Sequence, residues 1–256
     1  MIFTNLIQAN LRTKIFGKEI EYYQRLSSTN EEAWDLIKNE EASHGMIVIT
    51  DNQFQGKGRS GNSWFMSPSK GLAMSLIILE SLSAEKVRLI PLLTGIAIAK
   101  TLENRGYSPK LKWPNDILLN EKKVSGILCE SKLSGHSVQS IVVGVGINVN
   151  ESEQDFPEIL NQSATSLYIE TSHTHQRELV AAIFTTYFEQ LLEKLQTSSN
   201  EIISEWTHYC GHINETVSFN FQNEIKSGLF KGVDNSGQAR VIIDDTEHKF
   251  ASIILD

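Results

Sequence analysis

The strongest constraint on the fold is residues 51–64, DNQFQGKGRSGNSW, where glycines and charged residues interrupt the regular structure of the chain. This stretch directly follows residues 46–50, an apolar, β-branched run that predicts a buried strand. Three glycines disfavour both helix and strand here, so we expect a loop: Gly56, Gly58 and Gly61. Glycine alternating with Lys57 and Arg59 offers N–H groups and positive charge to an anion such as phosphate. A surface loop of solvated charges explains the stretch equally well, because short glycine-rich patterns are common by chance.

The composition is that of a globular protein. With 256 residues, of which 40% are hydrophobic, the chain can form one large core, or one large and one small domain. A formal net charge of −8 argues against nonspecific binding of nucleic acid. Cys129 and Cys210 lack the spacing of metal ligands and indicate a reducing compartment. We expect a cytoplasmic protein, because we find neither a secretory signal nor an apolar run of the roughly 20 residues that span a bilayer.

Helical and strand-like patterns alternate over residues 1–211. The first 26 residues predict an irregular lead-in with a short strand from residue 19, and Ser28 with Glu31 fits a capping box at a helix start. Helical spacing of apolar residues recurs at 87–104, 176–195 and 201–209, and strand-like runs lie at 72–79, 117–119, 123–131 and 138–150. Several of these strands are joined by short polar turns, which favours antiparallel pairing.

The last part of the chain has a different sequence pattern, with short strand-like runs only. Four short strand-like runs follow Gly211, at residues 216–221, 227–232, 239–243 and 249–255. Their spacing predicts a small, barrel-like β module. We therefore expect two domains, residues 1–211 and residues 212–256.

Polar residues stand at several strand ends where apolar ones would be usual. Lys112 ends a strand before Pro114, Asn115 and Asp116 follow at a tight bend, and Lys123 opens the next strand. Together with the glycine loop they supply cations, one carboxylate and amide donors, which suits a small carboxylate and a polyphosphate with a divalent metal. Each lysine alone is more simply a solvated surface residue.

The sequence lacks the motifs of several other enzyme classes. The sequence contains no GxSxG, neither cysteine has a local catalytic pattern, and GKGRSG does not have Walker A spacing. The segment Ser28-Thr29-Asn30 could simply cap its helix, or its small polar side chains could also bind a ligand.

Five motifs, in this order and spacing, resemble those of the biotin–protein ligases: S-T-N at 28–30, Q-x-x-G-K-G-R at 53–59, K-W-P-N-D at 112–116, K-x-x-G-I-L at 123–128 and G-x-G-I-N at 144–148. The resemblance covers nearly the whole chain, and K-W-P-N-D followed by K-x-x-G-I-L is its most specific part. The loop departs from the family's frequent G-R-G-R-R-G by having fewer cations, which puts its affinity for an adenylate in question.

The resemblance implies a fold and a reaction. The fold is α+β, with a mixed, largely antiparallel sheet and helices as in class II synthetases and biotin–lipoate ligases, plus an SH3-like C-terminal barrel. The reaction converts biotin and ATP, with Mg²⁺, into biotinyl-5′-adenylate and pyrophosphate, and then acylates a lysine of a biotin carboxyl carrier protein. The expected type is monofunctional, without a DNA-binding domain, so no DNA or membrane partner is expected. A homodimer could pair through the sheet edge after Asn120 or through strand 138–150.

Roles follow from the resemblance for individual residues. The catalytic group implied is Lys123, which contacts the biotin carboxyl group, with Arg59, Lys112 and Asp116, the last also a possible metal ligand. The residues implied to bind biotin or the adenylate are Ser28, Thr29, Asn30, Gln53, Gly56, Lys57, Gly58, Arg59, Trp64, Asn115, Lys123, Gly126 and Asn148. Two alternatives stay open: a lipoate or octanoate ligase or transferase, which would use a similar lysine with another acid, and a biotin-binding sensor without turnover.

Overall fold

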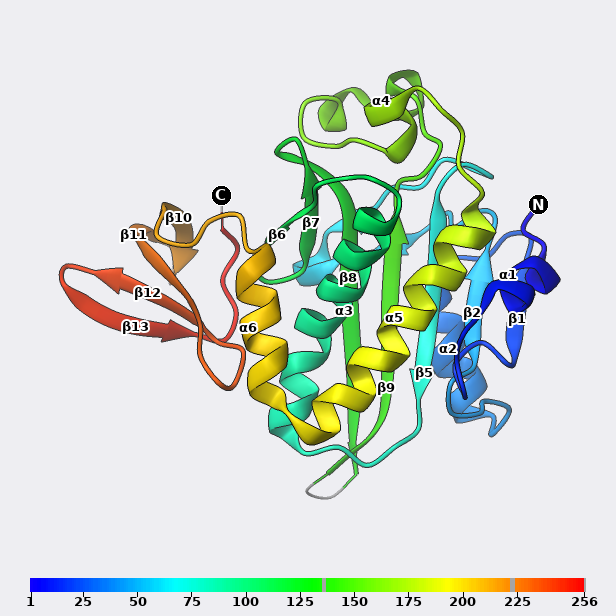
Figure 1. Cartoon of the computed structure of the whole chain (residues 1–256), viewed down its shortest axis with the longest axis horizontal. Helices are drawn as coiled ribbons and strands as arrows, with labels where there is room; N and C mark the ends of the chain where they lie inside the picture. The colour runs from blue at the N-terminus through cyan, green and yellow to red at the C-terminus, as the bar shows by residue number, and fades with distance from the viewer. Residues whose placement is uncertain (135–136, 222–223, 256) are drawn as a thin grey trace.

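The computed structural model describes residues 1–134, 137–221 and 224–255. Its centre is a seven-stranded sheet in the order β1-β2-β5-β9-β8-β7-β6 (Figure 1). The strands are β1 (Ile20–Tyr23), β2 (Ile47–Thr50), β5 (Leu72–Ile78), β6 (Lys110–Lys112), β7 (Asp116–Leu119), β8 (Lys122–Ser134) and β9 (Ser137–Ile147). The helices are α1 (Thr4–Asn10), α2 (Thr29–Lys38), α3 (Ala84–Asn104), α4 (Leu167–Thr171), α5 (Arg177–Thr197) and α6 (Ser199–Tyr209). This confirms the expected α+β class with a mixed sheet.

The sheet is antiparallel from β2 to β6, as the short polar turns predict, and only β1 pairs in parallel, with β2. The tight β7–β8 turn at Asn120 and Glu121 has positive φ values of 47° and 63°. The expectation that strand 138–150 could pair across a dimer is wrong, because β9 lies inside the sheet between β5 and β8. The sheet's edge strands are β1 and β6.

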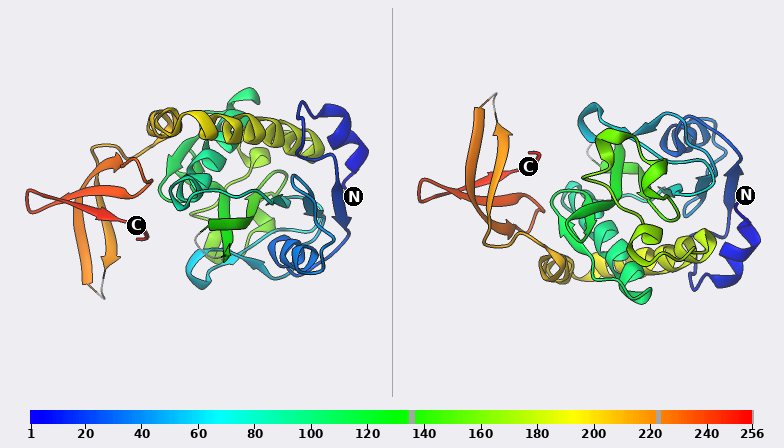
Figure 2. Two further views of the ribbon diagram at one scale, coloured as in Figure 1. Left: turned by 90° about the horizontal axis from the view of Figure 1, so that it is seen from below. Right: turned by 90° about the horizontal axis from the view of Figure 1, so that it is seen from above.

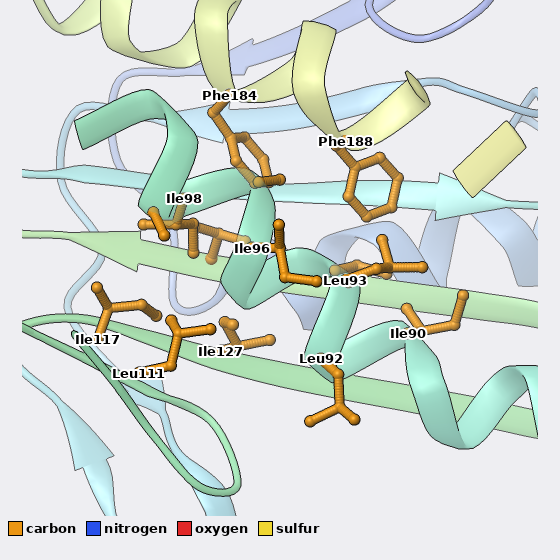
Figure 3. Close-up of a cluster of buried hydrophobic side chains, with 14 of the residues drawn as sticks. Ile90, Leu92, Leu93, Ile96, Ile98, Leu111, Ile117, Ile127, Phe184 and Phe188 are labelled. Carbon is orange, nitrogen blue, oxygen red and sulfur yellow. The ribbon is translucent and has the colours of Figure 1, made fainter. Parts of the chain in front are cut away.

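One face of the sheet is covered by α3 and α5, with α6 beside α3 (Figure 1). Apolar residues at helical spacing in α3, among them Ile90, Leu93 and Ile96, are fully buried against the strands and against Phe184 and Phe188 of α5 (Figure 3). Burial of side chains of this size stabilises a fold by about 1.5–3 kcal/mol each. No helix in the described part of the chain is long and apolar enough to cross a membrane.

α2 lies on the other face of the sheet (Figure 2). A smaller apolar cluster between α2 and the strands includes Ala33, Val48 and Val142. Ser28 is the N-cap of α2, but no capping box forms there. Glu31 instead bonds Ser27 and pairs with Lys57 of the glycine loop. Because α2 covers only part of this face, the sheet beside it is left for the site.

The lead-in contains a helix that sequence patterning missed. α1 has no side-chain cap and no charged residue in its terminal turns, and it is held by contacts with α5. The segment after it is fixed by the Glu189 carboxylate, which accepts the backbone N–H groups of Lys14, Ile15 and Phe16. Tertiary contacts therefore order this segment.

The C-terminal module is a four-stranded antiparallel sheet in the order β10-β11-β12-β13, at the end of the molecule opposite α1 (Figures 1 and 2). Its strands are β10 (Thr216–Phe221), β11 (Glu224–Val233), β12 (Ala239–Ile243) and β13 (Thr246–Phe250). The fourth strand lies earlier than the expected 249–255. The segment after it returns to β10, where Leu255 bridges Phe219.

Candidate functional site

Most of the motif residues line one cavity, bounded by α2, the 51–64 loop, β8, β9 and the C-terminal segment. The sequence-predicted residues around it are Ser28, Thr29, Asn30, Gln53, Lys57, Gly58, Arg59, Trp64, Lys112, Asn115, Asp116, Lys123 and Gly126. Gly56 lies just behind this wall, since a Cβ there would be 2.7 Å from the Gln53 amide nitrogen. Asn148 lines a neighbouring cavity instead.

One end of the cavity is a buried polar network. Gln53 Oε1 accepts the Thr29 N–H at 2.8 Å, and the Ser75 hydroxyl lies 2.7 Å from Thr29 Oγ1 and 2.6 Å from Asn30 Oδ1. The Asn30 amide donates to Glu130 at 2.8 Å. Thr29 and Asn30 are 4% and 3% exposed, so these groups are more than a helix cap. The network offers donors and acceptors to a small polar ring.

The floor of the cavity is strand backbone. Gly144 and Gly146 of β9 and Gly126 of β8 face it, and added Cβ atoms would meet side chains at once. At Gly144 a Cβ would lie 2.2 Å from Asn30 Oδ1, and at Gly146 it would lie 2.3 Å from the Trp64 indole. The Trp64 ring therefore lies directly on the sheet, where its buried Nε1 has no hydrogen-bond partner among the described residues.

The charged centre lies beside this floor. Lys123 Nζ is 2.6 Å from Asp116 Oδ1, and it also lies 5.8 Å from the centre of the Trp64 ring. The side chains of Lys123 and Asp116 are 35% and 28% exposed, so both are open to a ligand. Lys112 pairs with Asp116 in the β6–β7 register, which adds a second cation at the same place.

The glycine loop contains more structure than expected. Gly56–Lys57 (β3) and Ser63–Trp64 (β4) form a two-residue hairpin, joined by a short 3-10 turn at Arg59–Gly61 (η1). Lys57 pairs with Glu31 of α2, so it points away from the central charges. Arg59 donates to Asn115 Oδ1 at 3.4 Å and to the Ser252 hydroxyl at 3.0 Å. Burial lowers the pKa of the Arg59 guanidinium from its usual value, and no carboxylate pairs with it among the described residues.

The neighbouring cavity adjoins the first one at Trp64, Asp116 and Lys123. Its other walls include Phe65, Phe156 and Leu160, which the sequence motifs do not mark. Asn148 lines it, but the Asn148 amide donates to the Thr165 carbonyl at 2.9 Å, and the residue is 4% exposed. Asn148 therefore fixes the segment that forms the far wall.

Several site residues are outside the predicted set. Ser75 and Glu130 complete the polar network, while Ile254 and Leu255 line the cavity from the C-terminal segment. Ser75 had one sequence signal, because it is a polar residue within the apolar run 72–79. The C-terminal residues had none.

The titratable groups favour electrostatic chemistry over a thiol nucleophile. Burial raises the pKa of both cysteines, Cys129 and Cys210, to about 12, so neither is a thiolate near neutral pH. Within the described ranges, no group of three His, Cys, Asp or Glu side chains could hold a metal ion. Asp116 is the one carboxylate among the predicted site residues that line the cavity.

Comparisons with known proteins show which proteins this chain is similar to. The pattern of the biotin/lipoate A/B protein ligase family matches residues 22–148. The bifunctional ligase/repressor BirA of Bacillus subtilis is 33% identical over 90% of this chain and 71% of its own length. The biotin--[acetyl-CoA-carboxylase] ligase of Paracoccus denitrificans is 30% identical over 83% of this chain and 90% of its own length. The chain belongs to the biotin protein ligase family.

The solved structures lead to the same family. The biotin protein ligase of Aquifex aeolicus, in complex with biotin and ATP, superposes with a TM-score of 0.78 at 28% identity, covering 93% of this chain and 99% of that one. The protein is thus an enzyme of the ligase class, and biotin ligation is favoured over the lipoate and sensor alternatives.

Proposed function

We propose that this protein activates biotin with ATP to biotinyl-5′-adenylate and then transfers biotin to a lysine of a biotin carboxyl carrier protein. The observation that carries the proposal is the position of the Lys123–Asp116 pair, where the buried polar network, the cationic loop and the aromatic cavity meet. One ligand lying across this point would place a polar ring, a carboxylate and a nucleotide in three different surroundings.

The polar network fits the ureido ring of biotin. Such a ring has both N–H donors and a carbonyl acceptor, and Ser28, Thr29, Asn30 and Gln53 present both kinds of partner in a buried setting. Since buried polar groups left unpaired cost about 1–3 kcal/mol each, an acid without the ureido group should bind poorly. Glycine at 126 keeps the floor flat for the ligand's apolar part.

Lys123 is the proposed centre of the first step. A biotin carboxylate oxygen bonds to the α-phosphorus of ATP, the bond to the β-bridging oxygen breaks, and pyrophosphate leaves with the electron pair. Lys123, with Lys112 nearby, neutralises the two anions that must approach each other. In the second step the carrier amine attacks the acyl carbon, AMP leaves, and Asp116 accepts the amine's proton.

The nucleotide is proposed to occupy the second cavity. Trp64 offers an aromatic face for adenine, Asn148 supports the wall beside it, and Arg59 holds the phosphate. Mg²⁺ would arrive bound to the phosphates of ATP, with Asp116 and Asn115 as the available oxygen ligands, and would supply further charge neutralisation. Residues 55–63 would then order over the adenylate and exclude water.

The domain division, the cellular compartment and the oligomeric state are proposed from general features of the chain. Residues 1–211 would form the catalytic domain and residues 212–256 an SH3-like barrel, which the Leu255–Phe219 bridge would help to close. Two unpaired cysteines fit a reducing compartment such as the cytoplasm. The acidic charge offers little to DNA, and a homodimer that pairs through an edge of the seven-stranded sheet would use β1 or β6.

The test is an acceptor assay. The protein is incubated with a biotin carboxyl carrier domain, biotin and Mg-ATP, and biotin on the carrier is measured by mass. We expect one biotinyl group per carrier, none on a carrier whose acceptor lysine is arginine, and none when lipoate replaces biotin. Labelling with lipoate, or binding of biotin without any transfer, would contradict the proposal.

A further inference from the structure

Glu130 of β8 lies at one end of the buried polar network, where the sheet meets α2. Its Oε2 atom accepts the Asn30 side-chain amide at 2.8 Å, and the Leu128 carbonyl accepts the same amide nitrogen at 3.2 Å. The Trp34 indole N–H donates to the same carboxylate oxygen at 3.3 Å. Glu130 is therefore held by two side chains of α2, of which Asn30 lines the main cavity.

These contacts determine which way the Asn30 amide faces. A carbonyl oxygen and a carboxylate only accept hydrogen bonds, so together they take both hydrogens of the amide nitrogen. The Asn30 oxygen therefore faces the other way, toward Ser75. A Cβ at Gly144 would lie 2.2 Å from this oxygen, so the side chain is packed closely against the floor. Turning the amide over would set its oxygen against two acceptors, which is costly in a buried place.

The direction of hydrogen bonding continues through two hydroxyl groups. Ser75 lies 2.6 Å from Asn30 Oδ1, which has no hydrogen to give, so the single hydroxyl hydrogen of Ser75 is donated there. The 2.7 Å bond between the Ser75 and Thr29 hydroxyl groups must then use the hydrogen of Thr29. Both hydrogens are thus committed, and Thr29 Oγ1 can only accept further hydrogen bonds. In the opposite direction, Thr29 would instead donate to Gln53 Oε1, 3.3 Å away.

The part of the network that lines the cavity therefore has a defined polarity. Thr29 Oγ1 is an acceptor. Gln53 Oε1 accepts the Thr29 backbone N–H at 2.8 Å, which leaves the Gln53 amide nitrogen as a donor. Both residues line the main cavity. An acceptor beside a donor matches the N–H and C=O groups of a cyclic urea.

We propose that Glu130 is a positioning residue for the ureido ring: it sets the hydrogen-bond direction of the Asn30–Ser75–Thr29 chain, so that Thr29 accepts from a ring N–H group. The inference rests on the proposed biotin ligation and deepens it, because Glu130 stands outside the five sequence motifs. Glu130 acts through Asn30 rather than on the ligand.

The test compares two substitutions of Glu130 that differ in one property. Glu130→Gln removes the charge but keeps an acceptor oxygen, whereas Glu130→Met has a similar length and no oxygen. Glu153→Met is the control, because Glu153 is exposed and is not part of the cavity lining. Each variant is measured for the Kd of biotin without nucleotide, for the KM of ATP in pyrophosphate release, and for the free energy of unfolding in urea. Glu130→Ala, which also lacks an acceptor, replaces Glu130→Met if that variant does not fold.

For Glu130→Met we expect about a tenfold rise in the Kd of biotin, because Thr29 is no longer held as an acceptor. The KM of ATP should stay unchanged, since none of Asn30, Ser75 and Thr29 lines the second cavity. Glu130→Gln should keep most of the affinity for biotin, and Glu153→Met should match the wild type. Unchanged biotin binding in Glu130→Met would overturn the inference. A Glu130→Gln variant as weak as Glu130→Met would overturn it too, as would an equal loss of affinity for ATP.

A double variant tests the chain itself. Ser75→Ala interrupts the hydrogen bonds between Asn30 and Thr29, so adding Glu130→Met to Ser75→Ala should raise the Kd of biotin little further. If the two effects multiply instead, Glu130 does not act through Ser75 and the inference is wrong. A wild-type protein that binds no biotin would refute the proposed function, and the inference with it.

Discussion

Gly146→Ala gives the sharpest physical prediction. The new Cβ would lie 2.3, 2.5 and 2.6 Å from the Trp64 atoms Cε2, Nε1 and Cζ2. Since carbon atoms pack at about 3.5–4.0 Å, the indole must move by more than about 1 Å. β9 cannot yield, because Gly146 is paired with Ala73 on one side and Gly126 on the other. Overpacking of this kind costs about 1–3 kcal/mol when the neighbour stays in place.

Trp64 belongs to the two-residue strand β4, which pairs with the equally short β3. The loop that carries Trp64 should therefore move more easily than β9. We expect the loop to lift from the sheet, with faster hydrogen exchange at residues 56–64 and a shorter lifetime of bound biotinyl-adenylate. The assay is a double-mutant cycle in urea unfolding with Gly146→Ala, Trp64→Ala and the double variant. In the Trp64→Ala background the glycine substitution should be nearly neutral, which gives a coupling energy of about 1–2 kcal/mol. A coupling below about 0.5 kcal/mol would refute the packing argument.

Three further predictions concern charged side chains. Arg59→Ala should release biotinyl-adenylate about tenfold faster while changing the Kd of biotin less than about twofold. Weaker biotin binding with normal adenylate retention would contradict the proposed closure of residues 55–63 over the adenylate, and Lys110→Ala, outside the cavity lining, is the control. Lys123→Ala should nearly abolish pyrophosphate release. It should lower the free energy of unfolding by no more than about 1 kcal/mol, because the ion pair of Lys123 with Asp116 is partly exposed. Lys110→Ala, which breaks an exposed ion pair with Glu121, should keep full activity. Burial raises the pKa of Glu151 to about 7 from 4.5, so the protonated form favours the fold, and its contribution is full below about pH 4.5 and lost as the pH rises through about 7. Unfolding free energy should therefore fall between about pH 4.5 and 7, by an amount on the order of 3 kcal/mol, and Glu151→Gln should remove that slope.

Local sequence signals predicted the parts of this protein that are themselves local. The helix over 87–104, the tight turn after Leu119 and strand 239–243 all appear close to their expected bounds, because spacing and turn residues specify them. The fourth module strand was placed too late. Residues 246–249 are exposed and lack apolar alternation, so the sequence offers no strand pattern there.

The site residues also fall into two groups, those that a sequence motif marks and those that reach the site only through the fold. Motif residues such as Lys123 and Arg59 were found from the sequence because a family pattern marks them, and the structure brings them to one cavity. Ser75, Glu130 and Leu255 reach that cavity only through sheet pairing and through the return of the chain end to β10. Contacts between such distant segments leave no periodic signal in a single sequence.

The glycine floor has a consequence for redesign of the ligand specificity. Gly144 and Gly146 form a flat floor against which Asn30 and Trp64 pack, and the hydrogen-bonded ladder with β5 and β8 fixes their backbone in place. Glycine has no side chain to shorten or rotate, so any substitution at these positions fills the cavity. The cavity therefore cannot be widened at its floor. Variants that accept larger biotin analogues should instead arise in the walls, at side chains such as Asn30 and Trp64 that can be shortened.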